Sequence, residues 1–324
     1  MKGTYVQDLI RVVADIKQRR CNLSPTGFIA EQGIGSDDYV RIVPADDRAI
    51  TAVDGSNATV YSTPFFTLDV FRGAVTGYAR QERVMLRQTP LRIFRIGDGQ
   101  DEDYADVHRD YFGCEPAVPL DMGDTLAAEA AFRDTIEYGL AMAAAREASP
   151  GTLLLLDGAL YAEHPSHAPI LDAITDTCRE RGLLLAAVTK NAGATWDGKQ
   201  PLVPAAVKGA ATLGIQPPWY LKVKEGYVAC LHSSSARGFL VTVPDAYGDE
   251  EVSAVCSALS SYAGDGRVVG YPYPLMDAHR YAVIRHDLVR HVRNDIIAGC
   301  ATQSINYLDY EDILGDYHDE LNRY

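Results

Sequence analysis

Apolar and polar positions in the first third of the chain predict one helix followed by strands. Apolar side chains recur every three or four positions over residues 5–20, which predicts an amphipathic helix. Residues 50–54 have the pattern of a buried strand that ends in Asp54, and β-rich segments follow over 59–70 and 91–96. Because these segments follow one another closely, we expect an antiparallel hairpin or meander here.

The middle of the chain has the pattern of a parallel crossover. Asp124 is placed to cap a long Ala-rich helix that runs to about residue 147. A continuous apolar run over 152–157, a helical pattern over 169–181 and a strand pattern over 183–188 follow. This strand–helix–strand order requires a parallel crossover. Antiparallel strands followed by parallel strands and helices therefore predict an α/β fold with a mixed sheet flanked by helices.

The last third of the chain continues the mixed pattern. Short β segments are expected over 219–243, a helix over 249–262, and a last long helix from about Leu275. No internal repeat, low-complexity tract or convincing linker separates these segments. We therefore predict a single domain over residues 1–324.

The composition excludes several classes of protein. The 324 residues are 47% apolar and 23% charged, which is ordinary for a folded protein and excludes disorder as the main state. No apolar run is long enough to span a bilayer and the N-terminus lacks a signal-peptide pattern, so we expect a cytoplasmic protein without a membrane partner. The six cysteines are dispersed without a CxxC pair, which argues against a disulfide framework or a zinc site.

Two apolar runs end in the same dipeptide. Asp54-Gly55 and Asp157-Gly158 each follow the pattern of a buried strand. The carboxyl ends of strands in an open sheet form the ligand crevice, so two carboxylates there could share a divalent cation. A single Asp-Gly is more often a turn after a strand, and that interpretation stays open for each of them.

The long helix carries a charged stripe. Glu129, Arg133 and Glu137 are four residues apart and therefore share one helical face. Such a stripe is ordinarily a series of exposed ion pairs that contributes little to stability. The alternative is that it supplies a third carboxylate immediately before the strand that ends in Asp157.

Residues 270–279, which read Gly-Tyr-Pro-Tyr-Pro-Leu-Met-Asp-Ala-His, form the most distinctive segment of the chain. Pro274 suits the first turn of a helix, which would place His279 about one turn into that helix. A lone histidine is more often structural than a ligand. Together with carboxylates, however, it would complete a mixed nitrogen and oxygen site for a divalent cation.

Positive charge has to be local if the chain binds nucleic acid, because 30 basic and 44 acidic residues give a net charge of −14. The helix after His279 is locally basic, and Lys190 follows a predicted strand. Residues 219–224 interleave aromatic and basic side chains, as in a stacking surface for a single strand or in an ordinary β-strand. Motifs of other chemistries, GxxxxGK[ST], GxSxG and HExxH, do not occur in the sequence.

Taken in order, several segments resemble the NurA nuclease family. They are Ala52-Val53-Asp54-Gly55-Ser56, the helical turn from Arg133 to Glu137, Leu155-Leu156-Asp157-Gly158, Val188-Thr189-Lys190, and Gly270-Tyr271-Pro272-Tyr273-Pro274-Leu275 with Ala278-His279. Each motif alone is weak, and their order and spacing carry the resemblance. It covers residues 50–285 and implies one nuclease domain with its core at about 48–300, extended by the N-terminal helix and an acidic C-terminal tail.

This resemblance implies an RNase H-like fold, in which a mixed sheet of an antiparallel hairpin and parallel strands is flanked by helices. It implies a Mn²⁺-dependent deoxyribonuclease, with Mg²⁺ as the alternative cation. Such an enzyme is a 5′–3′ exonuclease on single- and double-stranded DNA and an endonuclease on single strands. The partners that it implies are DNA ends, a second copy of the chain in a homodimer, and a HerA-type hexameric translocase in end resection and recombinational repair.

Site residues are carried over from the family only at matching positions. The resemblance implies that the metal is bound by Asp54, Glu137, Asp157 and His279, and that the catalytic residues beside it are Lys190 and Tyr271. Lys190 would offset charge that builds on the phosphate, and Tyr271 either positions DNA or water or only packs. We further predict DNA contacts at Arg133, Arg280 and Arg285. The chain departs from the family at Ala192, where a small hydroxyl residue is expected.

The chemistry that follows is metal-assisted hydrolysis of phosphodiester bonds. The alternative from another class is a non-catalytic RNase H-like module that binds nucleic acid or serves as an assembly platform. The fold alone does not separate these two functions, because function resides in the site.

Overall fold

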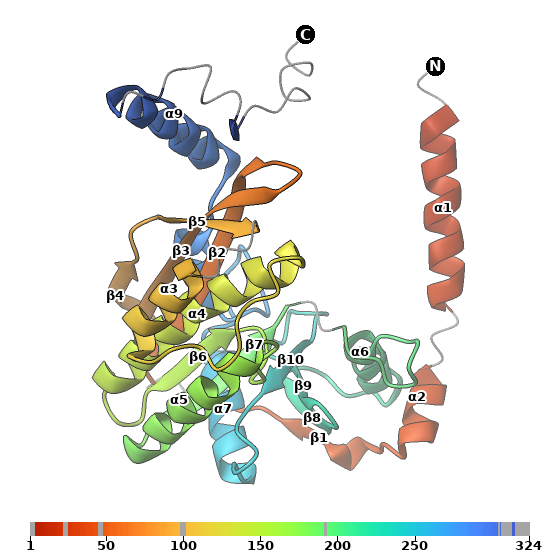
Figure 1. Cartoon of the computed structure of the whole chain (residues 1–324). Coiled ribbons are helices and arrows are strands. Elements are labelled where there is room, and N and C mark those ends of the chain that lie inside the picture. The colour runs from red at the N-terminus through yellow and green to blue at the C-terminus, as the bar shows by residue number, and fades with distance from the viewer. Residues whose placement is uncertain are drawn as a thin grey trace. The chain divides into compact units, whose positions relative to one another are not determined.

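The structure is a computed structural model (Figure 1). It describes residues 4–21, 25–44, 48–97, 102–190, 193–303, 305 and 313–314. The chain divides into two compact units, a smaller one of Met1–Asp46 and Ala186–Tyr273 and a larger one of Asp47–Leu185 and Pro274–Tyr324. Compact units of this kind can belong to one folding domain, so the single domain stays a prediction. Ala192 and nearly all of the acidic tail over 309–324 lie outside the described residues.

The larger unit contains a mixed sheet. Its strands are β2 (Ile50–Ser62), β3 (Phe66–Ala79), β4 (Glu82–Gln88), β5 (Arg92–Gly97) and β6 (Leu153–Asp157). β2 and β3 form a long antiparallel hairpin, β3 also pairs with β4 and β5, and β2 pairs with β6 in parallel. The predicted combination of an antiparallel hairpin with a parallel strand is therefore confirmed.

Helices cover both faces of this sheet. They are α3 (Glu102–Phe112), α4 (Thr125–Glu147), α5 (Ala168–Glu180), α8 (Tyr273–Ala282) and α9 (His286–Thr302), with a 3₁₀ turn over Pro165–His167. Helix α4 lies across β2 and β3 (Figure 1). Asp124 caps it as predicted, because its side chain accepts a hydrogen bond from the backbone N–H of Ala127 at 3.1 Å.

Apolar side chains fill the space between α4 and the sheet. Phe94 of β5 and Phe132 of α4 stack with their ring centroids 4.6 Å apart, and Phe71 and Ile136 pack beside them. On the opposite face, Val60 and Val70 pack against α9 through Val289 and Val292. A buried phenylalanine at such a position contributes strongly, and its truncation to alanine costs about 3–5 kcal/mol.

The smaller unit is an antiparallel sheet with helices against it. Its strand order is β1 (Tyr39–Arg41), β8 (Trp219–Val223), β9 (Gly226–Cys230), β10 (Phe239–Thr242) and β7 (Leu184–Thr189), whose first two residues belong to the larger unit. Its helices are α1 (Thr4–Cys21), α2 (Pro25–Gln32), α6 (Leu202–Thr212) and α7 (Asp249–Ser261), with a 3₁₀ turn over Ser36–Asp38. Trp219 is buried in its core, and the Tyr39 hydroxyl donates to the carbonyl of Ala206 at 2.9 Å.

The prediction of one long helix from about Leu275 is wrong. The chain forms α8 and α9 instead, separated by residues 283–285. Arg72 donates to the carbonyls of Ala282 and Val283, at 3.2 and 2.6 Å, so both carbonyls are engaged by a side chain of the sheet at the point where α8 ends. Because α8 ends at Ala282, His279 lies in its last turn.

The predicted N-terminal helix is present as α1, and its apolar side chains from Tyr5 to Val13 are exposed. Among the helices that the structure describes, none combines the length and the apolar character needed to cross a membrane.

Candidate metal centre

Two neighbouring strands bring Asp54 and Asp157 together. β2 and β6 run in parallel with Val53 opposite Leu156, so the next residue of each strand is an aspartate. Asp54 is 3% exposed, whereas Asp157 is partly exposed at the end of β6. Gly158 follows with a φ of +108°, a conformation that glycine adopts without strain. The chain thus turns away immediately after Asp157, and the Asp54 carboxylate lies beside it at the carboxyl end of β6. The prediction that the first strand ends at Asp54 is wrong, because β2 continues to Ser62 in its long pairing with β3. The segment expected over 59–70 is likewise divided between β2 and β3 by the turn at 63–65.

Helix α8 adds an imidazole to these carboxylates. The Nδ1 atom of His279 lies 2.7 Å from Oδ2 of Asp54, and the histidine side chain is 48% exposed. One ligand atom from each of Asp54, Asp157 and His279 lies within 4.8 Å of the other two. We call these three residues the His279 group. In the described ranges, no other set of three or more histidine, cysteine or acidic side chains comes this close.

Hydrogen bonds to the sheet hold α8 in place. The Tyr78 hydroxyl donates to Oδ2 of Asp277 at 2.6 Å, and Arg83 forms an ion pair with the same oxygen at 3.0 Å. Thr76 donates to the carbonyl of Pro274 at 2.8 Å. Because Asp277 is two residues before His279, these contacts fix the backbone that presents the imidazole. The sequence gives no signal for them, since their partners on β3 and β4 are about 200 positions away.

Glu137 and Arg133 approach from α4 against Gly55. A Cβ atom on Gly55 would lie 3.1 Å from Cγ of both side chains, so the absence of a side chain there lets α4 come close to β2. Glu137 is outside the His279 group, but the charges interact. Withdrawal from water raises the pKa of Glu137 well above its ordinary value, and the charges of Asp54, Asp134 and Asp157 raise it further, against the effect of Arg133.

Arg133 is surrounded by acidic side chains. It donates to Asp134 at 3.0 Å. Burial acts to lower its pKa, but the charges of Asp134, Glu137 and Asp54 outweigh this effect and raise it. The guanidinium therefore serves first as a counter-charge within the site, and the DNA contact predicted for it stays a prediction. Arg280 and Arg285 are exposed, at the end of α8 and immediately before α9.

Lys190 and Tyr271 belong to the smaller unit and contact each other. The Lys190 Nζ atom lies 5.8 Å from the centroid of the Tyr271 ring, a distance at which an ammonium is attracted to an aromatic face. The ring of Tyr271 is largely buried and packs against Phe239 at 5.2 Å. The pairing is consistent with either interpretation of Tyr271, so the roles of both residues stay predictions.

The donor set suits a divalent cation. Two carboxylates and one imidazole are a mixed oxygen and nitrogen set that matches Mn²⁺ and is less suited to Mg²⁺ or Ca²⁺, which prefer oxygen alone. A cation would also offset the repulsion that raises the pKa of Glu137. The residues present therefore fit the metal that the sequence predicts.

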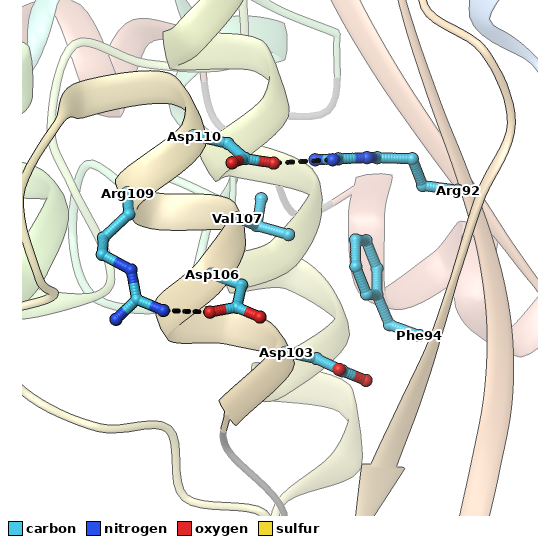
Figure 2. A pocket seen from close by; sticks show the side chains of 7 residues that line it. All are labelled: Arg92, Phe94, Asp103, Asp106, Val107, Arg109 and Asp110. Carbon is cyan, nitrogen blue, oxygen red and sulfur yellow. Dashed lines mark hydrogen bonds and ion pairs between the residues drawn. The ribbon is translucent and has the colours of Figure 1, made fainter.

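A pocket elsewhere in the larger unit has a different character. It has a volume of about 490 Å³ and lies between β5 and α3 (Figure 2). Arg92 forms an ion pair with Asp110 at 2.7 Å, and Arg109 pairs with Asp106. The arginines that line the pocket are thus neutralised within it, and no predicted site residue lies among its walls.

Comparison with solved structures identifies relatives by fold. The chain is similar to crystal structures of NurA (TM-score 0.54, 10% identity, covering 91% of this chain and 97% of that one), NurA with manganese (0.56, 9%, 90% and 98%) and NurA bound to dAMP and manganese (0.55, 10%, 89% and 96%). No protein-family model matches the chain, and no curated protein sequence does. At these identities the likeness establishes the fold, which is RNase H-like.

Proposed function

We propose that this chain is a Mn²⁺-dependent deoxyribonuclease. The observation that carries the proposal is the His279 group: two carboxylates and an imidazole within 4.8 Å of one another at the carboxyl end of β6. The NurA structures, two of which contain manganese and one of which also contains dAMP, have the same fold and support the same chemistry here.

Each residue of the site has a role in this proposal. Asp54, Asp157 and His279 bind the cation, and Glu137 adds a carboxylate beside Asp54 and Asp157. When bound, the cation polarises the phosphate and makes water nucleophilic near neutral pH. From the resemblance to NurA we also propose that Lys190 offsets charge on the phosphate and that Tyr271 either positions DNA or water or only packs.

The DNA contacts that we propose are Arg133, Arg280 and Arg285. Arg280 and Arg285 are the better supported, because both are exposed and close in sequence to His279. With a net charge of −14, long-range attraction of DNA is weak, so these local cations have to supply the phosphate contacts.

The finer activity is proposed from the resemblance in sequence and fold to NurA. It comprises 5′–3′ digestion of single- and double-stranded DNA, endonuclease activity on single strands, and action as a homodimer with a HerA-type translocase in end resection. The exposed apolar side chains of α1 leave a surface that a second chain could cover, which is compatible with a dimer.

Substitution at the His279 group tests the proposal. Asp54→Asn and Asp157→Asn each remove a negative charge while keeping the shape of the side chain. We expect Mn²⁺-dependent cleavage of end-labelled DNA to fall by at least about a hundredfold, because metal catalysis supplies several kcal/mol. The matched control is Asp176→Asn on the exposed face of α5.

The apo-proteins should remain folded, since each substitution also relieves repulsion among carboxylates. Asparagine variants that cleave DNA as fast as the wild type would refute the metal centre. A wild type that binds DNA without cleaving it in Mn²⁺ would identify the non-catalytic module instead.

A further inference from the structure

A second cluster of oxygen atoms lies under the N-terminal half of α4. On the sheet it contains Asn57 and Thr59 of β2 and Thr67 and Asp69 of β3, and on the helix it contains Glu129. We call these five residues the Asp69 cluster. The Asn57 side-chain amide donates to Oε2 of Glu129 at 3.2 Å, and the Thr59 hydroxyl donates to Oδ1 of Asp69 at 2.8 Å. Thr59 and Asp69 are directly opposite in the β2–β3 register.

Two oxygen atoms of the cluster are buried without a hydrogen bond. Asp69 is 0% exposed, and its Oδ2 atom has no hydrogen-bond partner among the described residues. The Thr67 hydroxyl lies near enough to the Asp69 carboxyl to lower its pKa, and it too is buried without a hydrogen-bond partner among the described residues. A buried carboxylate oxygen without a partner is costly, so an orphan of this kind indicates a ligand.

The charges in the cluster are unbalanced. Burial raises the pKa of Asp69. Burial also raises the pKa of Glu129, and the charge of Asp69 adds to that effect. Arg133 is the cation that opposes this shift, but its guanidinium is engaged by Asp134. The two carboxyl groups therefore repel each other, and a single arginine opposes that repulsion.

We propose that the Asp69 cluster binds a divalent cation of the hard, oxygen-preferring class to which Ca²⁺ and Mg²⁺ belong. The ligands are Oδ2 of Asp69, the hydroxyl of Thr67, the carboxylate of Glu129 and the side-chain carbonyl of Asn57, whose amide group is engaged with Glu129. Water completes the coordination through the exposed side of the cluster at Thr59. The donors are oxygen alone, which is the set that these cations prefer and which differs from the His279 group.

This site is separate from the His279 group because the two lie on opposite faces of β2. Side chains alternate along a strand, so Gly55 and Asn57 face α4, where they meet Glu137 and Glu129. Asp54 faces α8, where it meets His279. The inference stands independently of nuclease activity, since it concerns a cation that does not touch the proposed catalytic residues.

Calorimetric titration of the full chain with Ca²⁺ and, separately, with Mn²⁺ tests the inference. We expect two sites in the wild type. Asp69→Asn and Glu129→Gln should each abolish the calcium-preferring site and keep the manganese site, whereas Asp54→Asn should do the reverse. The matched control for Glu129→Gln is Glu147→Gln, which changes an exposed acid of the same helix.

Thermal melting of the same variants gives a second readout, because a cation that binds the native state raises the melting temperature. Glu129 is only partly buried, so we expect Glu129→Gln to fold. If Asp69→Asn does not fold, calcium binding can still be measured in Glu129→Gln. Calcium binding that is unchanged in Asp69→Asn or in Glu129→Gln would overturn the inference, and so would a wild type with no site besides the one that Asp54→Asn removes. Failure here leaves the nuclease proposal intact, since that proposal is judged by cleavage in Asp54→Asn.

Discussion

Two acidic regions lie on opposite faces of β2, and they differ in the donors that they offer. The His279 group lies where β6 ends, contains an imidazole, and is open to solvent through a half-exposed histidine. The Asp69 cluster contains only oxygen donors, and its central carboxyl is fully buried. A half-exposed nitrogen ligand suits a transition-metal ion that has to reach a substrate, whereas a set of oxygen donors around a buried carboxyl suits a hard cation with a structural role. Acidity alone therefore does not mark a catalytic centre.

Removal of the nitrogen donor should affect one of the two regions and leave the other unchanged. His279→Ala should weaken Mn²⁺ binding by at least about tenfold, in line with the effect of disturbing metal ligands and their supports. Calcium binding at the Asp69 cluster should not change, because the imidazole lies on the other face of β2. Isothermal titration of both cations measures this, with the exposed His291→Ala as the control. Equal losses at both sites would show that the two regions are one.

A second substitution tests the close packing of α4 against Gly55 of β2. Gly55→Ala introduces a methyl group 3.1 Å from Arg133 and Glu137, whose flexible side chains have to move away. Displacement of Glu137 should slow Mn²⁺-dependent cleavage by about tenfold, since small errors in position are costly in catalysis. The change in the free energy of unfolding should stay within about 1–2 kcal/mol.

The control for this substitution is Gly266→Ala, whose added methyl group meets no atom within 4 Å. Cleavage rates and urea denaturation of both variants provide the measurements. Unchanged cleavage in Gly55→Ala would count against a role for Glu137.

The smallest effect that we expect is on the pH dependence of stability, through a buried histidine that contacts α4 between Glu129 and Glu137. Between them, the Thr135 hydroxyl donates to the carbonyl of Ala131 and so accepts a hydrogen bond from Nε2 of His167 at 2.8 Å. Burial, with the charges of His164 and His108, lowers the pKa of His167 to about 3. Below pH 6.5 the unfolded chain therefore binds a proton that the native chain does not, and stability falls on acidification towards pH 3.

The contribution of His167 is limited to about 1.4 kcal/mol for each pH unit in this window. The raised pKa values of Asp69, Glu129 and Glu137 act in the opposite direction, because they make the native state bind protons more tightly. Urea denaturation of the wild type and His167→Gln between pH 7 and 5 isolates the histidine. The variant should lose less stability than the wild type over this range, and parallel curves would contradict the assignment.

The site residues that could be predicted from the sequence are those that occur in regular local patterns. Asp54 and Asp157 can be recognised in the sequence because each ends an apolar run. The parallel register of β2 and β6 then makes them neighbours. His279 stands out in a segment rich in proline and aromatic residues. The mixed sheet follows from the order of strand and helix patterns.

Features that depend on distant partners cannot be predicted in this way. Asp69 lies inside a strand between Leu68 and Val70 without a turn signal, so its burial becomes visible only when α4 covers it. The break between α8 and α9 depends on Arg72, about 210 positions earlier in the chain. The support of α8 by Tyr78 and Arg83 has the same origin.

Anomalous diffraction from crystals of the wild type soaked in Mn²⁺ shows directly whether the His279 group binds the catalytic cation. We expect a strong manganese peak within coordination distance of Asp54, Asp157 and His279, and its loss in Asp54→Asn crystals soaked identically. A peak elsewhere with this group unliganded would mean that the His279 group is not the metal centre, and so would crystals without manganese of a chain that cleaves DNA in Mn²⁺.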